Sequence, residues 1–327
     1  MLAQVLYKAF GRRVGLFTSP HLVRINERIK INDTEIEDSD LTRLVEMVLR
    51  DQPQDDPFTF FELITLVAVH YFLEQNVEYA VFEVGVWGTH DTTNIWEKPL
   101  ATFITSVHMD HKQLLWPTLA QIQRNKMGIM KKWVPCYTPI DNPLMHWGAK
   151  IKQAKLHIVY DCVPTSLHWV HQQKNAAVVL HALREQWFPE KPILQGLQQV
   201  VHPGRLQFLT PHILLDGAHN AEGILALREY VASIRKKYSP LVTIFATTKS
   251  TENLLEFTDL LIQGDENFVV STSTFNKKLP TRFPFVVQEF TDIEAVVNYL
   301  RTVKRGLVVV YGSLYLLWSI LAERESK

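Results

Sequence analysis

Gly15-Leu-Phe-Thr-Ser-Pro-His-Leu-Val-Arg-Ile-Asn-Glu-Arg-Ile29 is the most informative stretch of this chain. Before it, residues 1–10 carry apolar side chains at helical spacing and stop at Gly11, a residue typical of a helix C-cap. The β-branched and aromatic run 13–17 then predicts a strand. Because Pro20 bars a helix directly after that strand, we expect residues 18–21 to form a loop. The stretch therefore predicts a helix, a strand and a loop in immediate succession.

The same alternation of strand and helix continues to the end of the chain. Similar short runs predict strands at 79–84, 101–106, 213–215, 242–246, 267–271 and 307–311. Helical spacing predicts helices at 40–50, 61–75, 119–131, 172–186, 221–233 and 293–303. This order is typical of an α/β protein with a mainly parallel sheet. A break at Val-Val-His-Pro-Gly, residues 200–204, predicts a boundary between two domains, 1–200 and 201–327.

The composition indicates a globular protein rather than a nucleic-acid or membrane protein. The chain has 327 residues, 46% of them apolar, with 34 basic and 34 acidic side chains. That neutral balance argues against a nucleic-acid surface, and no apolar run is long enough to span a bilayer. Two cysteines, Cys136 and Cys162, are too few for a disulfide framework and favour a reducing compartment. We therefore expect a cytoplasmic protein with no membrane and no nucleic-acid partner.

Polar residues follow the predicted strands, at the sheet edge where ligands collect in α/β proteins. Glu83 ends one strand and opens a Gly-rich turn that reaches Asn94. A carboxylate that leaves an apolar strand is costly unless it is paired, so Glu83 needs a metal or a lysine, or else makes a structural salt bridge. After the next strand come His108, Asp110 and His111, which could hold a metal or simply be solvated.

In the second predicted domain, Asp216-Gly-Ala-His-Asn220 connects a strand directly to a helix. Gly217 permits a tight turn there, and Asp216 and His219 project from a strand end and a helix start. Such a junction suits an anion. Gly312-Ser313 follows the last strand, which on its own is an ordinary turn.

Together these motifs resemble the folylpolyglutamate synthase and dihydrofolate synthase family of ATP-dependent amide ligases. Residues 83–94 resemble that family's Glu-Val-Gly-Leu-Gly-Gly-Arg-Leu-Asp-Ala-Thr-Asn, with Trp87 and Thr89 as departures. Residues 118–131 resemble Thr-Leu-x-x-Ile-Ala-x-Glu-Lys-Ala-Gly-Ile-Ile-Lys, with Asn125 in place of the glutamate. Pro-Gly-Arg at 203–205 and Gly-Ser-Leu-Tyr at 312–315 also match, so the similarity covers nearly the whole chain.

The resemblance implies a Mur-ligase-like α/β fold: a parallel-sheet, ATPase-type domain that binds ATP and folate, incomplete at its N-terminus, and a smaller, doubly wound domain that binds glutamate. It implies ATP and Mg²⁺, with folate or dihydropteroate and L-glutamate as substrates, and we expect a monomer. The implied magnesium ligands are Ser19, Glu83 and His111, the last supported by Asp110. Lys126 is implied to be carbamylated by carbon dioxide and to orient the phosphate.

The family resemblance also implies residues that bind the nucleotide and the substrates. The implied nucleotide-binding residues are Arg205, Asp216, Asn94 and Asn175. The implied glutamate-binding residues are His219 and Ser313, and the loop that includes His21 and Arg28 is implied to shape the folate side. Lys126, His219 and Asp216 are the candidate catalytic residues.

The position that matches the family's Gly-rich phosphate loop falls just upstream of Met1. We therefore expect a truncated chain and a poor or inactive ligase, unless the true start lies upstream. Trp87, Thr89 and Asn125 favour an alternative, a non-catalytic paralogue that binds folate, nucleotide or a partner. A peptidoglycan-precursor ligase is a third possibility, against which the motifs at 18–21 and 312–315 speak.

Overall fold

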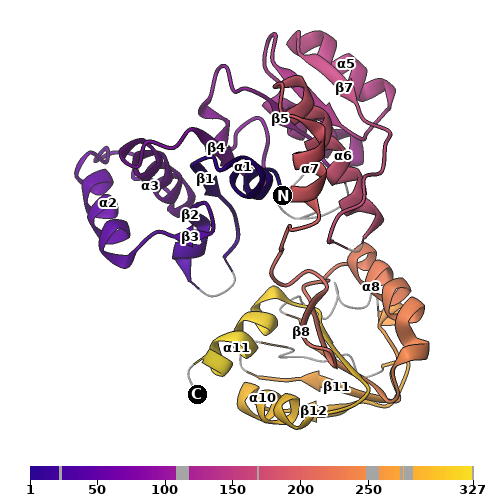
Figure 1. The fold of residues 1–327 in the computed structure, drawn as a ribbon. Helices are drawn as coiled ribbons and strands as arrows, with labels where there is room; N and C mark the ends of the chain where they lie inside the picture. Colours follow the sequence, from indigo (N-terminus) through magenta and orange to yellow (C-terminus); the bar gives the residue numbers. More distant parts are fainter. Residues whose placement is uncertain are drawn as a thin grey trace. The chain divides into compact units, whose positions relative to one another are not determined.

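The structure is a computed structural model that describes residues 1–21, 24–107, 118–167, 169–247, 258–272, 275 and 283–325. The chain divides into two compact units, Met1–Val201 and His202–Lys327 (Figure 1). No helix among the described residues combines the length and the apolar character needed to cross a lipid bilayer.

The first unit contains two small sheets with helices around them (Figure 1). Its strands are β1 (Val14–Phe17), β2 (Ile29–Ile31), β3 (Thr34–Glu35), β4 (Tyr79–Phe82), β5 (Thr102–Phe103), β6 (Pro135–Thr138) and β7 (Lys155–Ile158). Its α-helices are α1 (Leu2–Phe10), α2 (Asp38–Arg50), α3 (Phe60–Glu74), α4 (Leu119–Lys126), α5 (Pro143–Lys152), α6 (Val170–Glu185) and α7 (Glu190–Leu197). Three 3₁₀ turns, η1 (Ile25–Arg28), η2 (Thr92–Ile95) and η3 (Met127–Ile129), lie between them.

The first sheet has the order β3-β2-β1-β4, in which β1 and β4 run parallel and the β1–β2 and β2–β3 pairs run antiparallel. Helices α2 and α3 pack together, and their apolar faces share a core with β1 and β2. α3 begins at a capping box, in which Thr59 accepts from the Glu62 N–H and the Glu62 carboxylate accepts from the Thr59 N–H. Gly11 ends α1 with a positive φ of 62°, as predicted from the sequence.

The second sheet, β5-β6-β7, is wholly parallel. One core lies between this sheet, α1, α6 and α7 and includes Tyr137 and Ile193. A smaller core around Cys136, Met130 and Met145 joins η3, β6 and α5. The expectation of a helix over 119–131 was wrong in its second half, because α4 ends at Lys126 and the chain tightens into η3.

The second unit is a six-stranded sheet with helices on both faces (Figure 1). Its strands are β8 (Gln207–Thr210), β9 (Ile213–Asp216), β10 (Leu241–Phe245), β11 (Glu266–Val270), β12 (Gln288–Phe290) and β13 (Leu307–Tyr311), in the order β12-β11-β10-β13-β9-β8. Only the β8–β9 pair is antiparallel among the pairs in this sheet's described strands. Its helices are α8 (Ala221–Ile234), α10 (Ile293–Thr302) and α11 (Leu314–Glu325), with the 3₁₀ turns η4 (Arg235–Lys237) and η5 (Thr258–Leu260).

Alternation along the strands builds the core of this unit. Ile213, Leu215, Val308 and Val310 share one cluster with the buried faces of α10 and α11. Helix α8 lies on the other face of the sheet (Figure 1). The alternating sequence predicts the mainly parallel sheet and the family resemblance implies the doubly wound arrangement, so the structure confirms the α/β fold class.

Candidate active site

Ser19 and Glu83 meet at one edge of the first sheet. Parallel pairing of β1 with β4 aligns Phe17 with Phe82, and the Glu83 N–H donates to the Phe17 carbonyl at 2.9 Å. The Ser19 N–H in turn donates to Glu83 Oε2 at 2.9 Å. Glu83 is exposed, so burial does not require its carboxylate to be paired, and the metal or lysine partner expected for it stays a prediction. The pairing itself brings a hydroxyl-bearing residue and a carboxylate together at the strand ends.

Asp91 organises the Gly-rich turn that follows Glu83. The side chain is buried, and its Oδ2 accepts from the N–H groups of Val86 and Trp87, each at 3.2 Å. Its Oδ1 accepts from Thr93 N–H at 3.1 Å and from the Thr93 hydroxyl at 2.6 Å, which also caps η2. Four hydrogen bonds to one buried carboxylate fix the path of this turn.

The turn is held against the end of α4, where Lys126 lies. Gly88 N–H donates to Asn125 Oδ1 at 2.6 Å, and Thr89 N–H donates to the Asn125 carbonyl at 3.0 Å. The approach is so close that a Cβ on Gly88 would lie 2.2 Å from the Asn125 carbonyl oxygen and 2.7 Å from Lys126 Cα. A Cβ on Gly128 would likewise lie 2.1 Å from Thr89 Oγ1. The structure thus joins two sequence motifs through backbone contacts, with half-buried Lys126 at the junction.

Asn94 completes this junction. Its side-chain amide nitrogen donates to the backbone carbonyls of Thr89 and Gly128, each at 3.2 Å. The backbone carbonyl of Asn94 accepts from Lys131 Nζ at 3.1 Å. These bonds tie the end of the turn to η3. In the structure the side-chain amide of Asn94 makes hydrogen bonds within the protein. Its binding to a nucleotide therefore stays a prediction.

His21 and Arg28 form a pair on the loop after β1. Arg28 Nε donates to His21 Nδ1 at 2.8 Å, so neutral His21 carries its proton on Nε2. The Arg28 guanidinium is buried and lies 5.4 Å from the centre of the Phe60 ring. Burial, with the charge of Arg28 added, lowers the pKa of His21. The two residues predicted for the folate side are therefore together in the structure.

Asn175 and His111 are the remaining predicted residues of this unit. Asn175 is half-buried on α6, and its amide donates to Gln172 Oε1 at 3.2 Å. His111 and its neighbours Asp110 and His108 lie outside the described residues. Among the described residues, no group of three His, Cys, Asp or Glu side chains is arranged to hold a metal ion.

Asp216 fastens two segments of the second unit together. It is buried; its Oδ2 accepts from Leu206 N–H and its Oδ1 from Ala218 N–H, each at 2.8 Å. Gly217 N–H donates to the Gly204 carbonyl at 2.8 Å, so the Pro-Gly-Arg segment runs against the turn after β9. Burial raises the pKa of Asp216, while the Leu206 N–H and the Arg205 charge act in the opposite direction.

The ends of β9 and β13 are neighbours, as pairing of Asp216 with Tyr311 shows. Gly312, with a φ of 107°, passes so close to the next strand that a Cβ would lie 2.2 Å from the Ala246 carbonyl oxygen. Ser313 is buried, and its hydroxyl accepts from Tyr315 N–H at 3.2 Å at the start of α11. The Asp-Gly-Ala-His and Gly-Ser motifs therefore lie at one edge of the sheet.

The position of one proton on His219 follows from its contact. Nδ1 lies 2.7 Å from the Gly217 carbonyl oxygen. Because a carbonyl oxygen only accepts, Nδ1 carries a proton, and Nε2 is the basic atom of the neutral ring. The ring is half-buried, between the strand end and the start of α8.

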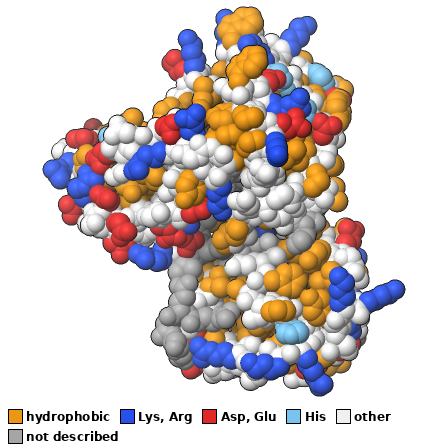
Figure 2. Space-filling view, viewed as in Figure 1, with side chains coloured by type: hydrophobic (Ala, Val, Ile, Leu, Met, Phe, Trp, Pro, Cys, Tyr) orange, Lys and Arg blue, Asp and Glu red, His pale blue; other side chains and the backbone are white. Residues whose placement is uncertain are grey.

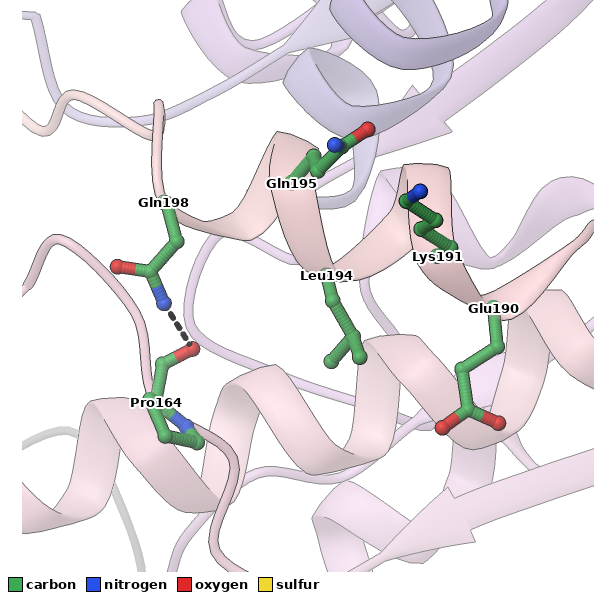
Figure 3. Close-up of a pocket in the computed structure, with 6 residues that line it drawn as sticks. All are labelled: Pro164, Glu190, Lys191, Leu194, Gln195 and Gln198. Carbon is green, nitrogen blue, oxygen red and sulfur yellow. Dashed lines mark hydrogen bonds between the residues drawn. The ribbon is translucent and has the colours of Figure 1, made fainter.

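A hollow of about 630 Å³ lies over α7 and contains none of the predicted residues (Figure 3). It is lined by Pro164, Glu190, Lys191, Leu194, Gln195 and Gln198. The Gln198 amide donates to the Pro164 carbonyl at 2.8 Å across one end of it. This hollow contains no cluster of catalytic groups, whereas the strand ends described above carry the polar residues, so we place the candidate site at the strand ends.

The sequence analysis gave no role to Asp91 and treated Asn125 as a departure from the family motif that favours a non-catalytic protein. Asp91-Thr-Thr is a recognisable N-cap sequence that could have placed the aspartate at the start of η2. The contact of Asn125 with Gly88 joins residues 37 positions apart. No local signal in the sequence predicts that contact.

Comparisons with known proteins agree with the motifs. No protein-family model matches the chain. Dihydrofolate synthase/folylpolyglutamate synthase of Bacillus subtilis is 28% identical over 95% of this chain and 84% of that protein. Folylpolyglutamate synthase of Lacticaseibacillus casei is 30% identical over 96% of this chain and 84% of that protein.

Solved structures show the same fold. FolC of Escherichia coli in complex with ADP superposes with a TM-score of 0.86 at 23% identity, over 99% of this chain and 85% of that one. A folylpolyglutamate synthase from Thermotoga maritima gives a TM-score of 0.81 at 25% identity, over 98% and 84% of the two chains. A bifunctional synthase from Yersinia pestis, complexed with AMPPNP and a manganese ion, gives 0.84 at 22% identity, over 99% and 85%.

Proposed function

Because the chain belongs to the folylpolyglutamate synthase and dihydrofolate synthase family, we propose that it is an ATP-dependent ligase that joins L-glutamate to a carboxylate of a folate or of dihydropteroate. The observation that carries the proposal is 30% identity to a folylpolyglutamate synthase over 84% of that protein. The meeting of Ser19 with Glu83, and of the Gly-rich turn with Lys126, supports it. Both lie where family motifs predict chemistry.

The proposed reaction has two steps. A substrate carboxylate oxygen attacks the γ-phosphorus of ATP, which forms an acyl phosphate and releases ADP. The glutamate amine then attacks the acyl carbon, loses a proton and expels inorganic phosphate, which leaves an amide. Phosphoryl transfer of this kind depends mainly on positioning and on neutralising charge.

The residues at the first strand ends fit a magnesium ion. The Ser19 hydroxyl and the Glu83 carboxylate are oxygen donors, which Mg²⁺ prefers, and this ion commonly takes only one or two protein carboxylates beside phosphate and water. When bound, Mg²⁺ would neutralise negative charge on the transferring phosphate. His111 stays a predicted further ligand, outside the described residues.

Lys126 is the residue that we assign to the transferring phosphate. It is half-buried at the end of α4, against the backbone of Gly88. Its neutral amine would add to carbon dioxide and release a proton, forming a carbamate anion that suits a second metal ion. The hydrogen bonds that Asp91 and Asn125 accept from the Gly-rich turn would keep that turn in place beside Lys126 during the reaction.

In the second unit we assign glutamate binding to His219 and Ser313. The basic Nε2 of neutral His219 would accept a hydrogen bond or the proton of the glutamate amine, because Nδ1 already donates to the Gly217 carbonyl. Arg205 would contact nucleotide phosphate as a cation. Asp216 would act as a positioning residue, since backbone N–H groups occupy both of its oxygens.

The test is release of phosphate by the purified chain with ATP, Mg²⁺, L-glutamate and either tetrahydrofolate or dihydropteroate. The proposal predicts release that requires every component and that falls to background in Lys126→Ala. Turnover that ignores glutamate would overturn it. Binding of ATP or folate by equilibrium dialysis with no turnover would favour the non-catalytic alternative, to which the substitution at Asn125 points.

A further inference from the structure

Positive charge is concentrated in one part of this electrically neutral chain. Between residues 124 and 155 the basic residues are Arg124, Lys126, Lys131, Lys132, Lys150, Lys152 and Lys155. Asp141 is the one acidic residue in the same range of the sequence. Arg124, Lys132, Lys150, Lys152 and Lys155 are all exposed. Most of the excess positive charge of this segment therefore lies on the surface.

Large apolar side chains stand among these cations. Trp133 is 65% exposed, Ile151 60% and Trp147 51%. Trp147 and Ile151 are four residues apart on α5 and so lie on the same side of that helix, while Met145, Gly148 and Ala149 face the core. Exposed apolar groups gathered in this way mark interaction sites more often than single exposed residues do.

We call the exposed cationic and apolar residues of this region the α5 patch, and two contacts connect the segments that carry them: Arg124, Lys132, Trp133, Trp147, Lys150, Ile151, Lys152 and Lys155. Trp133 N–H donates to the Gln153 carbonyl at 2.9 Å, so the turn before β6 lies against the end of α5. The Arg124 guanidinium lies 5.8 Å from the Trp147 ring centre, which joins α4 to the same face. In Figure 2, hydrophobic and Lys or Arg side chains stand together at the top of the view, where Figure 1 shows α5 and β7.

The cations of this region are also close enough to affect one another. Burial lowers the pKa of half-buried Lys131, and the charge of Lys152 lowers it further, with Glu97 acting in the opposite direction.

Lys132 Nζ lies 5.8 Å from the centre of the Trp133 ring. Each exposed indole of the patch therefore has a cation beside it.

We propose that the α5 patch binds an anionic lipid surface. Indole rings favour the boundary between water and hydrocarbon, and neighbouring lysines and arginines are attracted to anionic headgroups. The patch would lie on the membrane rather than enter it, since no described helix is long and apolar enough to span a bilayer. A second copy of the chain fits the patch poorly, because a two-fold interface would set like charges against each other. A stacked nucleic acid fits less well, because a cation already covers part of each indole.

The test is co-sedimentation of the full chain with vesicles. Vesicles of phosphatidylcholine with a minority of phosphatidylserine are compared with vesicles of phosphatidylcholine alone, at low and at high salt. The proposal predicts binding to the mixed vesicles only, and release of the protein as salt rises. Equal binding to both kinds of vesicle, or to neither, would overturn it.

Two patch variants and two matched controls locate the contact. Trp133→Ser with Trp147→Ser, and Lys132→Glu with Lys152→Glu, should each lower the vesicle-bound fraction by roughly tenfold or more. Trp187→Ser removes an indole that is 93% exposed on the same unit, and Lys236→Glu with Lys237→Glu makes the same change in net charge in the other unit. Both controls should bind like the unaltered chain.

The alternative partner is a soluble polyanion. Patch variants that bind vesicles as well as the controls do would contradict the proposal. So would a wild-type chain that binds single-stranded RNA or poly-glutamate and ignores vesicles, which would identify the patch as a polyanion site. Because wild-type protein supplies the lipid and salt comparisons, the proposal can fail even if a variant does not fold.

Discussion

Two turns follow strands at a sheet edge, one in each unit, and each is built around a buried aspartate. In the first unit Asp91 accepts four hydrogen bonds within residues 86–93, so its turn is self-contained. In the second, Asp216 accepts from Leu206 and Ala218 and so joins its turn to the segment before β8. The first turn is then fastened to α4 by Asn125, whereas the second is fastened by the aspartate itself.

The comparison separates residues that build the turns from residues that could perform chemistry. In both turns backbone N–H groups donate to the buried carboxylate, although the family resemblance implies a ligand-binding role for Asp216. The groups that we propose for chemistry are less buried: Glu83 is exposed and Lys126 half-buried in one unit, and His219 is half-buried in the other. Substitutions of the two kinds of residue should therefore differ in whether they affect activity, stability or both.

Lys126→Ala should separate activity from stability in the first unit. If Lys126 acts on the transferring phosphate, kcat should fall by about 10²–10³ while the free energy of unfolding changes little. Steady-state phosphate release and urea denaturation give the two quantities. Lys132→Ala, at an exposed site a few residues further on, is the control and should retain activity. A similar kcat for both variants would remove Lys126 from the mechanism.

Asp91→Asn should impair both stability and activity, because Asp91 builds the turn. The amide presents a donor where the carboxylate accepted from N–H groups, which should cost about 3 kcal/mol of unfolding free energy. Hydrogen exchange should show faster opening of residues 85–95. Asp161→Asn is the matched control, since exposed Asp161 pairs only at the surface with His181 among the contacts described, and should change stability by less than about 0.5 kcal/mol. An unaltered turn in Asp91→Asn would contradict the account.

Asp216 should make the stability of the second unit depend on pH. Its folded-state pKa is raised by burial, so its contribution is fully present below the unfolded value of about 3.8 and is lost as pH rises through the raised pKa. Hydrogen exchange of β9 and β13 between acid and neutral pH measures this slope. Asp216→Asn should remove that part of the slope while lowering stability overall, because the Leu206 or Ala218 N–H loses its acceptor. An unchanged slope would assign the pH dependence to another group.

The smallest expected effect concerns His21. Burial is the main cause of its lowered pKa, and the Arg28 charge adds to it, so Arg28→Gln should raise the pKa part of the way back to about 6.5. A titration followed by NMR measures the shift. Arg24→Gln, on the same loop but paired with Asp38, should leave His21 nearly unchanged. A fall in the His21 pKa in Arg28→Gln would contradict the electrostatic reading of this pair.

Local patterns were sufficient to predict much of the fold. The strand at 307–311 agrees with β13 at both ends, and the helix at 221–233 falls one residue short of α8. The helix expected over 119–131 ends early, at Lys126, and Gly128 just beyond it lies against Thr89, a contact that no local pattern predicts. The segment from β6 to β7 was not predicted, although Asn142 followed by Pro143 is a helix-start signal that α5 uses.

In the candidate site, the sequence predicted the contact between Ser19 and Glu83 but not the contacts of Asp91 and Asn125. Pairing of β1 with β4 follows from a parallel sheet, so the meeting of Ser19 with Glu83 agrees with the sequence argument. Asp91 and Asn125 stabilise the turn by accepting hydrogen bonds from particular backbone N–H groups. A sequence motif does not show which N–H groups will lie near these side chains. Residue type and position in the chain predicted which side chains lie at the strand ends, whereas tertiary contacts determine which carboxylates accept hydrogen bonds from the backbone.

The most direct test of the central claim follows oxygen from substrate to phosphate. A folate or dihydropteroate whose carboxylate carries heavy oxygen is incubated with the purified chain, ATP, Mg²⁺ and L-glutamate. If the chain is a ligase that works through an acyl phosphate, one heavy oxygen moves from the carboxylate into the released inorganic phosphate for each amide formed. Phosphate that carries no label, together with unmodified substrate, would contradict the account.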